Sequence, residues 1–116
     1  MKYYIIVLLL IFYSNNLKAQ TQAEMNSIAL NDYKKTDKEL NSVYSELIKL
    51  LSSEEKKLLI KAQKDWIKYR DSHCEFEIYD YEGGSMQPLI KFNCLEEHTR
   101  DRIDELKLAI ESRKNL

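Results

Sequence analysis

Residues that form turns are scarce in this chain and lie in one place. Only two glycines and one proline occur among the 116 residues, all within segment 80–88, DYEGGSMQP. Glycine and proline most often end helices and form tight turns. Their scarcity, with 32% charged and 44% hydrophobic residues, favours a few long helices over many short strands. A chain of this length has room for one hydrophobic core, so we expect one domain.

The N-terminal segment has the composition of a secretory signal peptide. Lys2 supplies a positive start, an apolar run follows over residues 3–13, and the small residue Ala19 stands at a suitable cleavage point. The apolar run is too short to anchor the chain across a bilayer. We therefore predict a signal peptide at residues 1–19, cleaved near Ala19, and a helical domain at residues 20–116. The mature chain should be periplasmic or secreted, with no membrane span.

Loss of the leader makes the protein slightly more acidic. Lys2 and Lys18 are removed, which leaves 16 basic residues against 19 acidic ones and a formal charge of about −3. An acidic surface argues against nucleic acid as a partner, because phosphates attract basic surfaces. A protein partner is the better expectation.

Two cysteines, Cys74 and Cys94, are the only ones in the chain. An exported protein meets an oxidising environment, in which a disulfide persists. Only one pairing is available, so we predict the disulfide Cys74–Cys94. A bridge that closes a loop of roughly twenty residues should stabilise the fold by on the order of 3 kcal/mol.

Hydrophobic residues recur at alternating gaps of three and four in three segments. The first segment is 21–51. The second follows a serine pair, of which one serine caps a helix that continues to about Tyr79. The third begins near Pro88, a residue that suits a first helical turn, and continues toward Ile110.

Three amphipathic helices with short connections predict an all-α fold, a small antiparallel three-helix bundle. Its second and third helices form a helical hairpin with one disulfide. Tyr44, Trp66 and Tyr69 share the spacing of the neighbouring leucines, so we expect these aromatic rings in the core. The alternative is an aromatic binding platform on the surface.

Two charged residues lie on or beside the apolar stripes. A buried aspartate without a partner is costly, so we predict that Asp37 and Arg70 form a charge-assisted pair within a structural polar network that includes Gln63 and Thr99. Tyr44 is a further candidate member. In the alternative interpretation both charges are solvated.

The sequence contains no recognisable catalytic or cofactor motif. The soft metal-ligand candidates are His73, Cys74, Cys94 and His98, and they lack the spacing of a zinc site. Adjacent residues on a helix point in different directions, so His73 and Cys74 do not form a thiolate–imidazole pair. We expect no enzyme activity, no cofactor and no metal site.

Residues spread over positions 21–107 follow a known pattern. They are Gln22-Ala23-Glu24-Met25-Asn26, Asp37, Leu40-Asn41, Tyr44, Gln63, Trp66, Tyr69-Arg70-Asp71, Cys74, Gly83-Gly84-Ser85, Cys94, Thr99 and Arg102. This pattern resembles the LprI-like family of lysozyme inhibitors. Members commonly carry two further cysteines, one just after the Met-Asn pair, where this chain has Ile28, and one near the mature start. The resemblance therefore implies that a second disulfide is missing here.

The resemblance implies an exported helical protein of the bacterial envelope that binds lysozyme and blocks peptidoglycan hydrolysis. An inhibitor must plug a cleft that holds two carboxylates, and the glycine-containing loop is best placed to do so. The candidate partner-binding loop consists of Tyr81, Glu82, Gly83, Gly84, Ser85, Met86 and Gln87. The alternative function is a periplasmic structural or adaptor module that binds an envelope partner or peptidoglycan without inhibitory activity.

Overall fold

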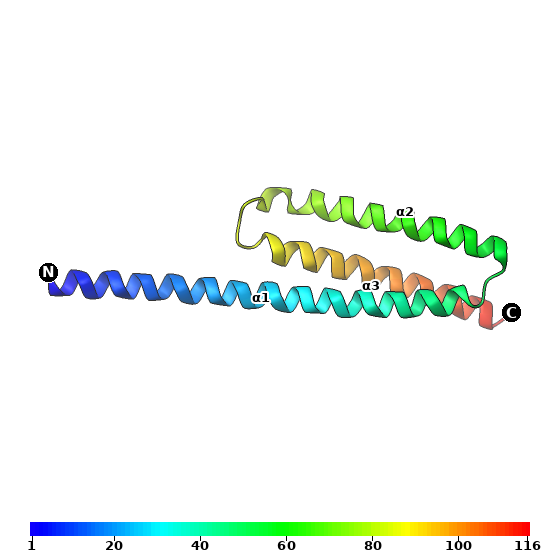
Figure 1. The fold of residues 1–116 in the computed structure, drawn as a ribbon, viewed down its shortest axis with the longest axis horizontal. Helices are drawn as coiled ribbons and strands as arrows, with labels where there is room; N and C mark the ends of the chain where they lie inside the picture. The colour runs from blue at the N-terminus through cyan, green and yellow to red at the C-terminus, as the bar shows by residue number, and fades with distance from the viewer.

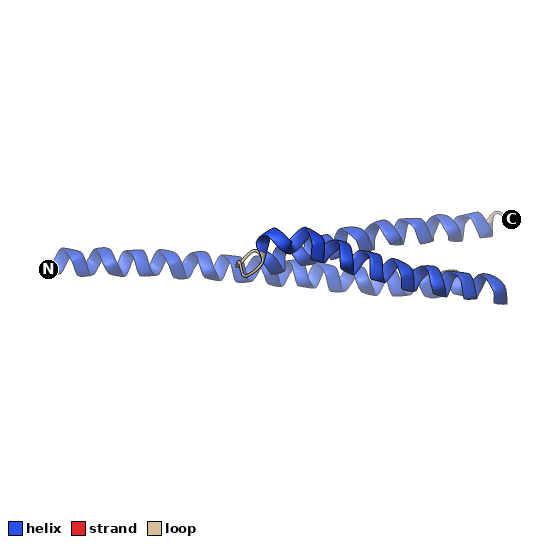
Figure 2. Ribbon diagram, turned by 90° about the horizontal axis from the view of Figure 1, so that it is seen from above, coloured by secondary structure: helices blue, strands red, loops and turns tan.

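The protein is a long helical rod. The computed structural model describes residues 1–116, except for the side chains of residues 18–20. Its elements are α1 (Lys2–Ile48), α2 (Ser53–Ile78), the 3-10 turn η1 (Tyr79–Tyr81) and α3 (Gln87–Lys114), and no strand occurs in the described chain. Successive helices run in opposite directions along the long axis (Figures 1 and 2). The predicted all-α class with three helices is therefore confirmed.

Helix α1 is longer than the sequence predicted. The expected helix at 21–51 ends at Ile48, and its helical backbone continues back through the segment expected to be a signal peptide, as far as Lys2. No glycine or proline interrupts this stretch, so nothing in the local sequence ends the helix earlier. The extension projects beyond the hairpin of α2 and α3 as the blue end of the ribbon in Figure 1. It gives the molecule a length of 80 Å against widths of 23 and 16 Å.

The extension makes few contacts with the rest of the chain. Its apolar side chains, from Tyr3 to Tyr13, are all at least half exposed. In the part of the chain that the structure describes, no helix is both long and apolar enough to cross a membrane. The expected cleavage point at Ala19 lies outside the residues whose side chains are described.

Helix α2 begins with a complete capping box. The Ser52 hydroxyl accepts a hydrogen bond from the Glu55 backbone N–H at 3.3 Å, and the Glu55 carboxylate accepts one from the Ser52 backbone N–H at 2.9 Å. This exchange satisfies two backbone donors that a helix start leaves unpaired. The bond from Ser52 holds the pKa of Glu55 below its ordinary value of 4.5. The serine cap predicted from the sequence is therefore Ser52.

Most of the core lies between α1 and α3. Its buried members are Leu40, Val43, Leu47, Leu51, Ile103, Leu106 and Ile110. Tyr44 and Trp66 pack against this cluster from the side and are partly buried. Helix α3 packs against both other helices, which is the arrangement that Figure 1 shows.

The inward face of α2 differs from the expected one. Its buried residues are Gln63, Arg70, Cys74 and Ile78, whereas Tyr69 is 59% exposed and Phe76 is 75% exposed. The prediction that Tyr69 fills the core is wrong. Half of the buried residues of α2 are polar, namely Gln63 and Arg70, so the spacing of apolar residues did not identify its inward face.

Candidate functional site

The loop between α2 and α3 closes on itself through backbone hydrogen bonds. The Gly84 N–H donates to the Tyr81 carbonyl at 3.0 Å, and the Gln87 N–H donates to the Gly84 carbonyl at 3.3 Å. Residues 81–86 are exposed, and Gln87, which begins α3, is half-buried. The candidate partner-binding loop is therefore a formed turn with accessible side chains.

The backbone geometry of this loop favours glycine at both positions. Gly83 has φ +74°, a left-handed conformation that other residues rarely adopt. A Cβ on Gly84 would lie 3.2 Å from the Tyr81 carbonyl oxygen, which is tighter than ordinary van der Waals contact. Substitution at either position therefore alters the shape of the turn.

Helix α1 supports the loop from the side. The Asn26 amide donates to the Ser85 carbonyl at 3.3 Å, and the Gln22 amide donates to the Asn26 side-chain oxygen at 2.8 Å. Between this part of α1 and residues 84–88 lies an open cleft of about 660 Å³. Two sequence motifs about sixty residues apart, one on α1 and one in the loop, thus meet at the loop end of the hairpin. Sequence reasoning identified each motif but not their contact.

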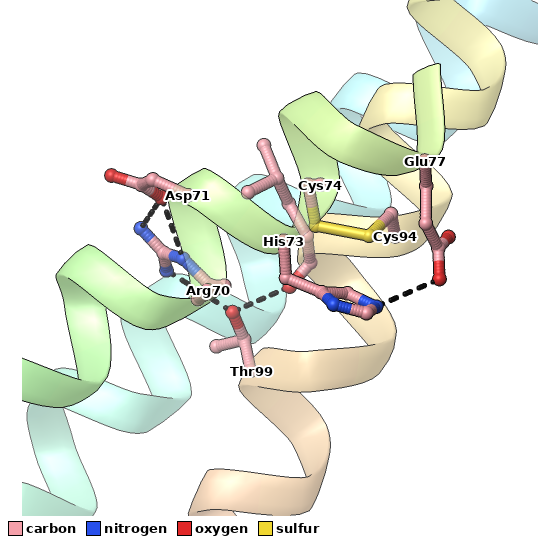
Figure 3. The surroundings of a disulfide bond; sticks show 8 residues. Arg70, Asp71, His73, Cys74, Glu77, Cys94 and Thr99 are labelled. Atoms are coloured by element: carbon pink, nitrogen blue, oxygen red, sulfur yellow. Dashed lines mark hydrogen bonds and ion pairs between the residues drawn. A yellow bond between two sulfur atoms is a disulfide. The ribbon is translucent and has the colours of Figure 1, made fainter. Parts of the chain in front are cut away.

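The predicted disulfide is confirmed, and it joins α2 to α3 close to this loop. Cys74 of α2 and Cys94 of α3 are joined with their Cα atoms 5.7 Å apart, and both are buried (Figure 3). Phe92 packs on the same cluster and stacks against Tyr33 of α1, with ring centroids 6.4 Å apart. A covalent bond and a ring stack therefore tie the three helices together near the loop.

Arg70 is buried beside the disulfide, but its partner is not the predicted one. Its guanidinium pairs with Asp71 at 3.0 Å, and its Nη1 donates to the Thr99 hydroxyl at 3.2 Å (Figure 3). The Thr99 hydroxyl in turn donates to the Leu95 carbonyl at 2.6 Å. Asp37 is only half-buried and forms no ion pair or side-chain hydrogen bond among the described side chains. The predicted pair of Asp37 with Arg70 is wrong, because the adjacent carboxylate already neutralises the guanidinium.

Two arginines enclose the single tryptophan. The guanidinium carbon of Arg70 lies 5.0 Å from the Trp66 ring centroid, and that of Arg102 lies 5.8 Å away. Arg102 also donates to the Gln63 side-chain oxygen at 3.0 Å. Gln63 therefore joins Arg102 rather than Arg70, and both arginines add a cation–π contact with Trp66.

Tyr33 closes the other side of Arg70. The guanidinium carbon lies 5.7 Å from the Tyr33 ring centroid. Burial raises the pKa of Tyr33 above its ordinary value of 10.0, although the charge of Arg70 opposes the shift. The phenol thus stays neutral at physiological pH and acts as a wall of the arginine pocket.

Two groups of potential metal ligands lie around the disulfide. One consists of Cys74, Cys94 and His98, and the other of His73, Glu77 and His98. The first group is not available while the cysteines are oxidised, because a metal requires thiolates. In the second group, His73 and Glu77 form a hydrogen bond of 2.9 Å on α2 (Figure 3). Sequence reasoning missed this group because it compared only histidine and cysteine spacings.

The fold and this site define a class: a small helical protein with one disulfide, an exposed and braced loop at one end, and an aromatic-lined arginine pocket beside it. The chain belongs to the LprI family, whose model, described as lysozyme inhibitor LprI, matches residues 14–106. The family resemblance of the sequence is therefore confirmed. This is a family of inhibitors, not of enzymes.

A relative supports the same relationship. An uncharacterized protein of Rhizobium meliloti (strain 1021), R02472, is 38% identical, and the alignment covers 84% of this chain and 80% of the relative. No solved structure matches the chain. The disulfide and the family together indicate an extracytoplasmic location.

Proposed function

We propose that this protein is exported and inhibits lysozyme by inserting the loop of residues 81–87 into the substrate cleft of the enzyme. Family membership carries the proposal. The geometry supports the proposed insertion, because the loop is exposed and lies at the end of a narrow hairpin. A loop of this kind enters a cleft more readily than the flat side of a helix does.

Preorganisation of the loop should favour binding. Backbone hydrogen bonds, the Asn26–Ser85 contact and the nearby disulfide restrict the loop before any partner arrives. A restricted loop loses less conformational entropy on binding, and this cost is a main reason why interfaces of equal area differ in affinity.

The chemistry of the loop fits a protein partner. Tyr81 is 41% exposed and Met86 is 45% exposed, and residues of these types are enriched in interface cores. Asp80 and Glu82 add negative charge beside them. An acidic inhibitor approaches a basic lysozyme favourably, although a charge of about −3 steers only modestly at physiological salt.

The test is a turbidity assay in which purified protein is titrated against several lysozyme types acting on a peptidoglycan suspension. We expect slowed lysis with at least one type. The double change Gly83→Asp plus Ser85→Glu should weaken inhibition by at least about tenfold, since it alters both the turn and the charge of the loop. A matched control, Ser45→Asp plus Ser112→Glu, adds the same charge at exposed sites far from the loop.

The control variant should inhibit as the parent does. An equal loss of inhibition in both variants would show a general effect of charge and would contradict the proposed role of the loop. No inhibition of any lysozyme type by the parent protein would contradict the proposed function itself.

A second candidate function is that of an envelope adaptor. It is favoured by the exposed aromatic residues Tyr69, Phe76 and Tyr79 of α2 and its C-terminal cap, because exposed apolar side chains on one surface often mark a site of protein interaction. In that case the protein should co-sediment with peptidoglycan or with one envelope protein while lysozyme keeps its full rate. The change Phe76→Ser plus Tyr79→Ser should abolish this association and leave inhibition unaffected.

A further inference from the structure

A cluster of metal-binding side chains occupies the outer surface of the α2–α3 hairpin. His73 and Glu77 lie one helical turn apart on α2, and His98 projects from α3 toward them. One donor atom from each residue lies within 4.8 Å of the other two. The imidazole rings of His73 and His98 have centroids only 4.8 Å apart. Three donors from two helices thus converge on one point.

The donor set matches the chemistry of a transition metal of the zinc class. Zinc binds imidazole nitrogen and carboxylate oxygen at about 2.0–2.2 Å, so tetrahedral ligands lie about 3.3 Å apart. His73 Nε2 and Glu77 Oε1 are already 2.9 Å apart, and the His98 donor lies within 4.8 Å of each, so on metal binding a side-chain rotation would have to close this remaining gap. Two histidines and one carboxylate fill three positions, which leaves the fourth for water or a donor from a partner.

The fold holds the two helices at a fixed distance beneath this cluster. Cys74 is the neighbour of His73, and Cys94 lies one turn before His98, so the disulfide joins the backbone segments that carry both histidines. Tyr69 flanks the rings, with its centroid 5.7 Å from His73 and 6.1 Å from His98. Because the disulfide already restricts the two segments that carry the histidines, metal binding costs less conformational entropy.

Ions from solvent can reach the cluster. The side chain of His73 is 31% exposed and that of Glu77 is 46% exposed. The hydrogen bond between them occupies the position that a metal would take. Binding would therefore replace one shared proton with the ion, as metal sites commonly do.

We propose that His73, Glu77 and His98 form a binding site for a divalent transition-metal ion of the zinc class. The bound ion links α2 to α3 beside the disulfide and stiffens the hairpin that carries the loop of residues 81–87. This site does not depend on the proposed inhibition of lysozyme, because its ligands lie on the helices rather than in the loop.

The experiment uses the full chain with its disulfide intact and without a polyhistidine tag, after removal of metals by a chelator. Isothermal titration with Zn²⁺ should give one site per chain with a dissociation constant below about 0.1 mM. Titration with Co²⁺ should give the visible absorption of a tetrahedral site. The melting temperature should rise with Zn²⁺, because the ion binds the folded state.

The variants Glu77→Ala and His98→Asn should each weaken Zn²⁺ binding at least about tenfold and abolish the thermal shift. Glu75→Ala is the matched control, since it removes an exposed carboxylate from the same helix outside the cluster. Circular dichroism confirms that each variant folds. The absence of saturable binding by the parent, or equal binding by parent and Glu77→Ala, would overturn the proposal.

Discussion

At the scale of single residues, the polar interior of α2 was the least predictable feature. Arg70 is 7% exposed and is satisfied by its own chain neighbour Asp71, by Thr99 and by two aromatic rings. Sequence spacing identified Arg70 and Thr99 but selected Asp37 as the partner, because spacing does not reveal which of several carboxylates lies within reach. Aromatic rings can also stabilise a guanidinium through cation–π contact. Since these rings are uncharged, charge patterns in the sequence do not identify them as partners of Arg70.

Thr99 offers a clean test of this arginine pocket. Its side chain is completely buried, and its hydroxyl accepts from Arg70 and donates to the Leu95 carbonyl. Thr99→Val keeps the shape but removes both bonds, so it should lower the free energy of unfolding by about 1–3 kcal/mol. Urea denaturation with the disulfide intact measures the change.

The control for this substitution is Ser112→Ala, which removes an exposed hydroxyl from the same helix. It should change stability by less than about 0.5 kcal/mol. Equal stability of Thr99→Val and the parent would show that the Arg70–Thr99 bond contributes nothing to the fold.

At the scale of elements, the start of α2 and the whole of α3 were predictable because local chemistry decides them. The serine followed by acids signals the cap, Pro88 lies in the first turn of α3, and the expected apolar stripe of α3 is buried from Leu95 onward. The start of α1 was not predictable in this way. A signal-peptide pattern predicts processing, and it carries no helix-ending residue that would separate the leader from the domain.

The cap of α2 yields a prediction with a pH dependence. Ser52→Ala should lower the free energy of unfolding by about 1 kcal/mol, whereas Ser53→Ala, one residue further along, should have little effect. The pKa of Glu55 is lowered in the folded state, so its contribution is present above pH 4.5 and is lost as the pH falls through the lowered value. The bond that lowers this pKa most comes from the Ser52 backbone N–H, which Ser52→Ala retains, so most of this pH dependence should persist in Ser52→Ala and be lost in Glu55→Ala.

Thermal or urea unfolding at pH 7 and near pH 3 tests this prediction. A Glu55→Ala variant that loses as much stability in acid as the parent would contradict the role of the Glu55 carboxylate. A large loss of unfolding free energy in Ser53→Ala would show that Ser53, not Ser52, caps the helix.

At the scale of the whole molecule, the main prediction is the division of the chain into a cleaved leader, residues 1–19, and a helical domain, residues 20–116. The all-α class and the disulfide were predictable from two strong signals, which are the long uninterrupted periodicity and the single cysteine pair. The sequence does not locate the Asn26–Ser85 contact or the His73–Glu77–His98 cluster, because both depend on how helices distant in sequence align.

Export can be measured on the intact protein. We expect the envelope fraction of an expressing cell to contain a chain that begins at Gln20, which intact-mass spectrometry would show. Leu8→Arg plus Leu9→Arg breaks the apolar run, so the chain should keep its leader and stay in a reducing compartment. Its cysteines should then react with an alkylating reagent.

A parent protein recovered from the envelope with its leader still attached would contradict the expected cleavage. Unchanged processing of the double-arginine variant would contradict the role of the apolar run.

The contact between Asn26 and Ser85 also has a practical consequence. A tag fused ahead of Gln22 would stand beside the loop, whereas the C-terminus lies at the opposite end of the rod (Figure 1). Coupling the protein to a sensor chip through its C-terminus would leave the loop facing the solution. An N-terminal fusion would shield it and could mimic a loss of affinity.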